Sequence, residues 1–459
     1  MYGGTDLPVS SGARRHRLPG PRISPPGACA ARSGHGRRAW RAPSPSPEGG
    51  GDDRHGLPAA SAAPSPATEA GVAWDSSERG ASAHPAAGKP TTAPFGDPVS
   101  PSTAALARAP RPGQAAATGS YHALSRQVRD AGLLGRTKAF YITLVVVLGL
   151  LLGGLATGSV LLGDSWFQLL VAAGLGIVLT QVAFVAHEAS HRQVFTSGPA
   201  NDRLGRILAN GVVGISHSWW MSKHSRHHAN PNHVGKDPDI APDTIVFLPQ
   251  DAARRGRVKA ALTRVQGWAF FPLLTLEGLN LHVTSVRSLL KDERGRTRTL
   301  ELAMIAARLG AYVALVMWFL PVGTAFGFLG VQLAVFGVYM GASFAPNHKG
   351  MAVIPEGSRL DFLSKQVLTS RNVVGGTWMS MLMGGLNYQI EHHLFPSMPR
   401  PHLARARRLV RAHCAEHGVP YTETTLMRSY VIVVRYLNDV GLAARDPFDC
   451  PMVQRFRSV

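Results

Sequence analysis

Three short clusters of histidine contain the residues of this sequence that could do chemistry. Within each cluster the spacing is three or four residues, which places the side chains on one face of a helix. The clusters are "HEASH" with His187 and His191, "HSRHH" with His224, His227 and His228, and "QIEHH" with Gln389, His392 and His393. The glutamine takes the place that a histidine has in the second cluster. Each cluster therefore predicts polar side chains that point in one direction.

Together the clusters predict a site for a pair of metal ions. Imidazole suits iron, zinc and copper, and a single zinc ion takes only about four ligands. The seven cluster histidines are too many for one such ion, but they suit two. Whether the glutamine binds metal directly, binds it through water or only hydrogen-bonds a ligand stays open. Metal-bound imidazoles need an acceptor for the other ring nitrogen, and the candidates nearby in sequence are Glu188, Asp237, Asp239 and Glu391.

Four apolar stretches explain how the clusters are positioned. Each is long enough to cross a bilayer, which takes roughly 20 helical residues. They run at about 139–162, 166–186, 302–320 and 322–344. The connections within each pair are short and lack Lys and Arg, whereas the other flanks are rich in both. The positive-inside rule then places both termini and the long middle loop in the cytoplasm. The sequence predicts an all-α integral membrane protein with two helical hairpins and every histidine cluster on one side.

A fifth apolar segment, at about 265–283, complicates this count. It contains Pro272, Glu277 and His282 and has basic residues on both flanks. A full crossing here would put the third histidine cluster on the opposite membrane face from the first two. We therefore interpret the segment as interfacial or re-entrant.

Single histidines outside the clusters have a plainer explanation. A lone histidine at a membrane boundary usually caps a helix or lies in the interface, and this interpretation applies to His217, His282, His402, His413 and His417. The same explanation does not account for three clusters on one membrane face. Polar side chains beside membrane helices cost free energy to bury and usually mark a functional site.

The two ends of the chain differ from the apolar region in composition. Residues 1–118 are rich in Pro, Gly, Ala, Ser and Arg, so we expect a disordered arm without a cleaved export peptide. Residues 431–459 are expected to form a cytosolic tail. The net charge of +20 fits a basic face against anionic lipid, and no recognised nucleic-acid module is present, so no nucleic-acid partner is expected. The three cysteines are far apart and predict free thiols.

The clusters and their surroundings resemble the membrane fatty acid desaturase family. The resemblance rests on the three histidine motifs within "SWWMSKHSRHHANPNHVGKDPDI" and "NYQIEHHLFPSMPR", together with "FAPNHKGM". It covers roughly residues 120–430, and we take 119–430 as the desaturase domain. It implies a cytosolic helical cap over four transmembrane helices, a non-haem di-iron centre and O2-dependent dehydrogenation of a lipid- or CoA-linked acyl chain. The implied location is the cell inner membrane, with the active site in the cytoplasm.

Carried over residue by residue, the resemblance implies a specific set of iron ligands. They are His187, His191, His224, His227, His228, His392 and His393, with His348 of "APNHKG" as a further ligand. Asn347 is a candidate for a water-mediated or supporting contact. Three aromatic residues are candidates to shape an acyl tunnel: Trp219, Trp220 and Tyr388. Basic residues of the cap are candidates for an anionic head group, although a solvated or lipid-facing surface is the commoner role: Lys223, Arg226, Arg400 and the run from Arg405.

Glutamine at the start of the third motif resembles the front-end branch of the family, which inserts a double bond between an existing one and the carboxyl end. Many front-end enzymes carry a fused cytochrome b domain with an "HPGG" motif, whereas this sequence has only "HPAAG" at His84. We therefore expect a separate electron donor, such as a ferredoxin with a flavin reductase. A histidine-motif hydroxylase or ketolase is the alternative enzyme. A non-catalytic membrane metal-binding or transport protein is the alternative of another class, although a transporter would place its ligands near the bilayer midplane.

Overall fold

The computed structural model describes residues 114–291 and 295–443 of the 459-residue chain. The predicted disordered arm, 1–118, and the end of the predicted tail, 431–459, lie mostly outside the described residues. The domain boundaries at 119 and 430 stay predictions, although one described helix, α17 (Leu426–Ala443), continues across residue 430. One of the three cysteines, Cys414, is described, and it is a buried free thiol.

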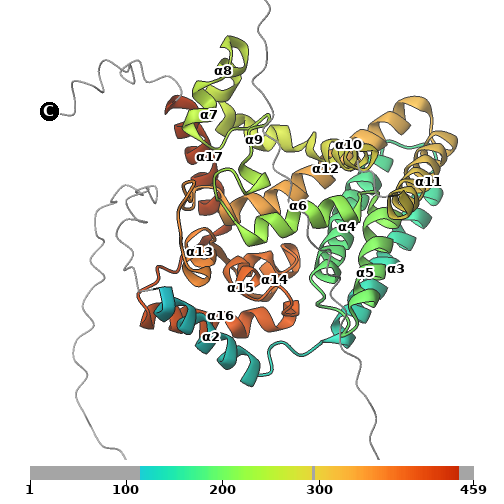
Figure 1. Cartoon of the computed structure of the whole chain (residues 1–459). Coiled ribbons are helices and arrows are strands. Elements are labelled where there is room, and N and C mark those ends of the chain that lie inside the picture. Colours follow the sequence, from blue (N-terminus) through green and yellow to red (C-terminus); the bar gives the residue numbers. More distant parts are fainter. Residues whose placement is uncertain (1–113, 292–294, 444–459) are drawn as a thin grey trace, which may run out of the picture. The chain divides into compact units, whose positions relative to one another are not determined.

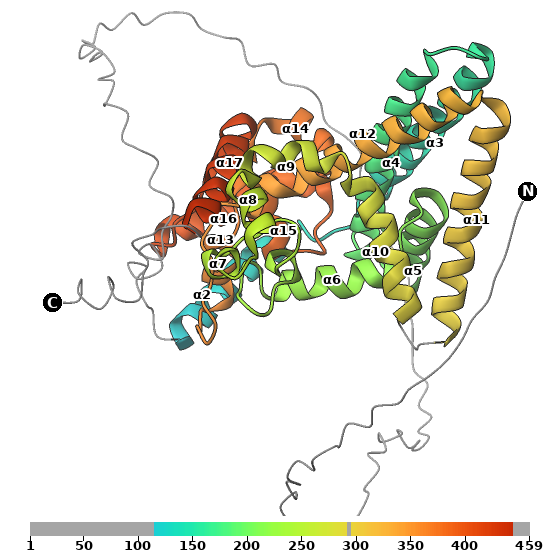
Figure 2. The same cartoon turned by 90° about the horizontal axis from the view of Figure 1, so that it is seen from above.

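Four helices of the described residues are long and apolar enough to cross a membrane, as predicted. They are α3 (Lys138–Leu162), α4 (Gln168–Ser190), α11 (Gly295–Phe319) and α12 (Val322–His348). α12 and α3 both pack against α4, and α11 packs against α12 (Figures 1 and 2). Large apolar side chains on their outer faces are exposed, among them Leu161 at 82%. Such a surface is stable against lipid but not against water, and the chain is an integral membrane protein.

The helices extend beyond the apolar stretches into the histidine motifs. α4 continues to Ser190 and α12 continues to His348. Because the backbone hydrogen bonds of each span continue into these polar ends, His187 and His348 have fixed positions at the ends of rigid helices. The short connections that were predicted within each pair of spans are present at residues 163–167 and 320–321.

The fifth apolar segment forms two short helices that meet at Thr275: α9 (Gln266–Leu274) and α10 (Glu277–Lys291). Neither has the length and composition of a span, in agreement with the predicted interfacial or re-entrant segment. α10 lies directly against α12 at two glycines. A Cβ on Gly278 would lie 2.3 Å from the carbonyl oxygen of Leu333, and a Cβ on Gly337 would lie 2.4 Å from the Gly278 nitrogen. This close approach holds the start of α10 beside a membrane helix.

The other described elements form the cap and its connections, and helices predominate among them. The helices are α2 (Gln114–Asp130), α5 (Gly198–Arg206), α6 (His217–Ala229), α7 (Pro249–Ala253), α8 (Arg257–Arg264), α13 (Phe362–Leu368), α14 (Gly376–Leu382), α15 (Gln389–Leu394) and α16 (Arg400–Glu416). Short turns of other helical types are η1 (Ile207–Val213), η2 (Pro238–Ile240) and η3 (Leu386–Tyr388). The strands among the described residues are β1 (Asn372–Val374) and β2 (Glu423–Thr425), which pair in parallel.

The apolar core of the cap fixes the third histidine motif. Ile390 and Leu394 of α15 are buried with Leu124 of α2 and with Leu403 and Val410 of α16. α15 is too short to be stable alone, so this burial determines its position. The core therefore presents His392 and His393 toward the membrane helices.

Candidate metal centre

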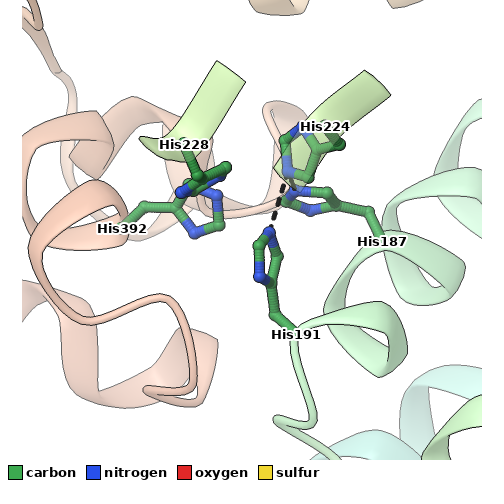
Figure 3. A group of neighbouring side chains, drawn as sticks. All are labelled: His187, His191, His224, His228 and His392. Atoms are coloured by element: carbon green, nitrogen blue, oxygen red, sulfur yellow. Dashed lines mark hydrogen bonds between the residues drawn. The ribbon is translucent and has the colours of Figure 1, made fainter. Parts of the chain in front are cut away.

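Five histidines converge at the end of α4 (Figure 3). Their ligand nitrogens all lie within 4.8 Å of one another, and the residues are His187, His191, His224, His228 and His392. The Nε2 atom of His224 lies 2.9 Å from that of His187 and 2.8 Å from that of His191. α4 supplies His187, and the residue that caps its C-terminus is His191; α6 supplies the next two members and α15 the last. We call this set the five-histidine group.

Three further histidines form a second buried group beside the first. His227 comes from α6, His348 from the end of α12 and His393 from α15. The Nε2 atoms of His227 and His348 are 3.3 Å apart. The rings of His228 and His393 stack with centroids 4.2 Å apart, so this three-histidine group adjoins the five-histidine group. The structure therefore brings all eight predicted histidines together, although their roles as ligands stay predictions.

Gln389 and Asn347 both adjoin the three-histidine group. The side-chain nitrogen of Gln389 lies 2.9 Å from the Nε2 atom of His348, and Asn347 donates a hydrogen bond of 3.2 Å to the Gln389 oxygen. Both side chains are buried. Gln389 thus lies beside the Nε2 atom through which His348 would bind metal, and the three roles left open for Gln389 stay predictions. Asn347 holds the side-chain oxygen of Gln389.

The outer ring nitrogens of the three-histidine group all have hydrogen-bond acceptors. The Nδ1 atom of His227 lies 3.1 Å from both carboxylate oxygens of Asp237 and 3.3 Å from Asp239. His348 Nδ1 contacts the carbonyl oxygen of Thr369 at 2.9 Å, and His393 Nδ1 contacts the side-chain oxygen of Gln366 at 2.9 Å. An acceptor at Nδ1 keeps the proton there and turns the Nε2 lone pair toward the site, where that of His348 accepts from the Gln389 amide unless it binds a metal.

Asp237 is therefore an acceptor as predicted, and Asp239 lies beside the same ring nitrogen. The prediction is wrong for the other two carboxylates. Glu391 instead accepts hydrogen bonds from Asn372 and Tyr421, at 2.8 Å and 2.7 Å. The histidines of α15 lie on its i, i+3, i+4 face, whereas Glu391 lies on the opposite face, toward β1 and β2. Gln366 and Thr369 were missed because α13 meets α15 only in the folded cap, which no sequence spacing reveals.

Glu188 forms a buried ion pair with Arg400. The Nε and Nη2 atoms of Arg400 donate to its carboxylate at 2.7 Å and 2.6 Å, and both side chains are only 2% exposed. Tyr141 lies in the same cluster, 3.4 Å from Glu188. Arg400 is therefore not a head-group cation on the surface of the cap. The pair instead joins the end of α4, which carries His187 and His191, to the first residue of α16.

The donor atoms of the centre fit a metal site. The Nε2 atoms of His392 and His393 and both ring nitrogens of His228 are buried without a protein partner. Buried polar atoms rarely stay unsatisfied. Burial lowers the pKa of His224, His228, His392 and His393, which favours the neutral imidazole that binds metal. Burial also opposes the charged form of His227, but Asp239 and Asp237 raise its pKa overall.

A cavity of about 530 Å³ leads to the histidines. Its inner end is lined by His224, His227, His348 and Gln389. Apolar side chains from the connection after η2, from α9 and α10 and from α12 line its length: Ile245, Phe247, Phe270, Leu273, Leu274, Leu281, Met340 and Phe344. The shape and lining suit a long apolar ligand with its reacting part beside the histidines.

One of the three aromatic residues proposed for a tunnel lines this cavity. Trp220 stacks on the ring of His224 at a centroid distance of 5.0 Å, and it also borders a smaller apolar pocket beside His187. Trp219 instead packs with the apolar core around α4, and Tyr388 packs in the core of the cap. Lys223 also lines the cavity, where it pairs with Asp239 at 2.9 Å.

Four membrane helices, a helical cap and two histidine groups define an integral membrane protein with histidine clusters that fit a metal site. Residues 164–425 match the family described as "Fatty acid desaturase". The match includes more than half of the chain, which therefore belongs to the fatty acid desaturase family.

Curated relatives support the same assignment. The chain is 28% identical to the Delta(8)-fatty-acid desaturase 2 of Arabidopsis thaliana over 342 residues, which is 71% of this chain and 75% of the relative. It is 27% identical to the Delta(6)-fatty-acid desaturase fat-3 of Caenorhabditis elegans over 348 residues, 70% of this chain and 75% of the relative. It is 30% identical to the Acyl-lipid (9-3)-desaturase of Physcomitrium patens over 292 residues, 60% of this chain and 54% of the relative.

Proposed function

We propose that this chain is an O2-dependent, front-end acyl desaturase that introduces a cis double bond with a non-haem di-iron centre. The observation that carries the proposal is the position of the eight histidines, in two adjoining groups at the inner end of an apolar cavity. Gln389 at the start of the third motif supports the front-end branch. The names of the relatives, which include Delta(8), Delta(6) and (9-3) desaturases, support it independently.

Each histidine group would hold one iron. When bound, such a pair supplies the O2 chemistry that removes hydrogen from an unactivated methylene, which side chains alone cannot do. Neutral imidazoles with free Nε2 atoms suit this metal. Asp237, the Thr369 carbonyl and Gln366 keep protons on the outer nitrogens of the three-histidine group, so that each Nε2 atom stays available.

The remaining work of the protein is to orient the acyl chain and exclude water. Phe247, Phe270 and Phe344 line the cavity and would restrict an extended chain to a path that ends beside His224 and His348. Orientation of this kind can lower a barrier by about 7–11 kcal/mol. The apolar lining would also exclude water from the reacting carbons, which suppresses side reactions.

Electrons would come from a separate protein, such as a ferredoxin with a flavin reductase. The proposed location is the cell inner membrane, with the histidines and both termini on the cytoplasmic side. The positive-inside pattern supports this orientation, because the flanks that carry the histidines are also those rich in Lys and Arg.

Product analysis tests the proposal. The full chain is expressed in a host that supplies the electron donor, and fatty acids are analysed by mass spectrometry with each double bond located. The expected result is a new cis double bond on the carboxyl side of an existing one. A hydroxylated product without a new double bond would assign the chain to the hydroxylases and contradict the proposal.

A further inference from the structure

A further group of metal-binding side chains lies at the end of α16, in the sequence "HCAEH". A ligand atom from each of His413, Glu416 and His417 lies within 4.8 Å of the other two. The two histidines repeat the i, i+4 spacing of the first histidine motif, and their rings stack with centroids 4.1 Å apart. This group shares no residue with the five-histidine and three-histidine groups. It is therefore a separate candidate site.

The end of α16 fixes the ring of His417. His417 caps the helix, and Gly418 follows it with a left-handed φ of 66°. The backbone N–H of His417 donates to the carbonyl oxygen of His413 at 3.1 Å, and the Nδ1 atom of His417 lies 2.9 Å from the same oxygen. Because a carbonyl oxygen only accepts, Nδ1 carries the proton. The Nε2 atom of His417 therefore has a free lone pair for a metal.

The ring of His413 is positioned by α2. Its Nε2 atom lies 2.7 Å from the side-chain oxygen of Ser120, and α2 packs against α16. Burial lowers the pKa of His413, and His417 acts in the same direction, so the ring is neutral near neutral pH. When Nε2 donates to the Ser120 hydroxyl, the lone pair of Nδ1 is free. Each imidazole of the group thus has an outer partner, as metal-bound imidazoles require.

Glu416 and the helix end supply the negative charge that a cation needs. Glu416 is exposed, and it forms no ion pair among the described residues. The C-terminal end of a helix carries partial negative charge, which favours a cation beside the last turn. Two imidazoles and one carboxylate form a known ligand set for Zn²⁺, with water in the fourth position. The exposure of Glu416 and His417 leaves this fourth position open to solvent.

We propose that this group is a zinc site that joins the end of α16 to α2. His413 Nδ1, a carboxylate oxygen of Glu416 and His417 Nε2 would bind the ion. Zn²⁺ binds such donors more tightly than Fe²⁺, so zinc is the ion expected here. α16 shares its apolar core with α15, and a bound ion would stabilise the part of the cap that holds the third histidine motif. The site does not depend on the proposed desaturation.

Zinc binding to the iron-loaded full chain tests the inference. The purified chain is loaded with iron, equilibrated with Zn²⁺ and desalted, and both metals are measured per chain. The unmodified chain is expected to retain one zinc ion without loss of iron. His417→Ala and Glu416→Gln are expected to weaken zinc binding by more than the roughly 10- to 100-fold that loss of an outer partner costs, with iron unchanged. These exposed residues are chosen because loss of the buried His413 would disturb the packing of the cap.

Two more variants separate a built site from an adventitious ion. Ser120→Ala removes the outer partner of His413 and should weaken zinc binding about 10-fold. His122→Ala is the matched control, because it removes an exposed histidine of α2 outside the group and should leave zinc binding unchanged. Zinc should raise the midpoint of thermal unfolding of the control but not of His417→Ala, since a ligand of the folded state stabilises it.

Two results overturn the inference. Equal zinc retention by the unmodified chain and by His417→Ala would show an adventitious ion only. Zinc uptake that occurs only as iron is lost would place the zinc in the histidine groups instead. Neither result bears on the proposed function, which product analysis tests separately.

Discussion

The two histidine groups lie side by side but are positioned by different means. In the three-histidine group, every outer ring nitrogen has its own acceptor, from Asp237, Thr369 and Gln366. In the five-histidine group, the Nδ1 atom of His187 and both nitrogens of His228 are buried without a protein partner. His187 in the last turn of α4 and His191 at its C-cap are instead positioned by that helix, whose end is joined to α16 by the Glu188–Arg400 pair.

This difference shows that the chain combines two ways to prepare a metal site. Hydrogen bonds to individual rings set both orientation and tautomer in the three-histidine group. Rigid helix ends set only the position of the rings in the five-histidine group, so a bound metal would complete their orientation. The two groups should therefore respond differently to the same kind of substitution.

The largest effect is expected when a predicted ligand is removed from either group. His392→Ala in the five-histidine group and His227→Ala in the three-histidine group should each abolish double-bond formation while membrane insertion persists, because both groups are needed. Fatty acid analysis and membrane fractionation measure the two properties. His417→Ala is the control, since this exposed histidine lies outside both groups. Near-normal desaturation by either ligand variant would remove that histidine from the centre.

Loss of the ion pair should affect chiefly the five-histidine group. Arg400→Met leaves the Glu188 carboxylate buried without its cation, which should cost about 3–5 kcal/mol of stability. The double variant Glu188→Gln with Arg400→Met is the matched control, and it should recover part of the loss because no charge stays buried. Thermal unfolding and iron content per chain are the measurements. Equal losses in the single and double variants would show that the charge of Glu188 is not what Arg400 compensates.

A substitution beside His227 should affect the three-histidine group selectively. Asp237→Asn removes the charge of the carboxylate that holds the Nδ1 atom of His227, and such changes lower metal affinity or activity about 10- to 100-fold. Metal titration of the purified chain should show weakened binding of one iron and unchanged binding of the other. Weakening of both irons to the same extent would contradict the separate organisation of the two groups.

The smallest effect is expected at Gln389. The Gln389 amide lies 2.9 Å from the Nε2 atom of His348, the atom that would bind iron. Gln389→Ala should therefore cost no more than one hydrogen bond, about 0.5–1.5 kcal/mol, and activity should fall only a few-fold. Gln389→His places an imidazole in the same position and should retain iron. If Gln389→Ala loses one iron completely, the glutamine is a ligand in its own right rather than a support for His348.

Much of this arrangement was predictable because its signals are local in sequence. The apolar stretches predicted the four spans, and the i, i+3, i+4 spacing predicted which side chains share a helix face. Contacts between distant segments were not predictable. Arg400 was interpreted as a surface cation because its own neighbours are polar and basic, and only the folded chain brings it to Glu188, which lies 212 residues away. No sequence motif marks Gln366, because its role arises only when α13 packs against α15 in the folded chain.

Metal analysis of the purified full chain tests the central claim most directly. If both histidine groups bind iron, active protein should contain two iron ions per chain, and His392→Ala and His227→Ala should each contain fewer while the His417→Ala control retains both. A single zinc ion per chain in active protein, with no iron, would contradict the account.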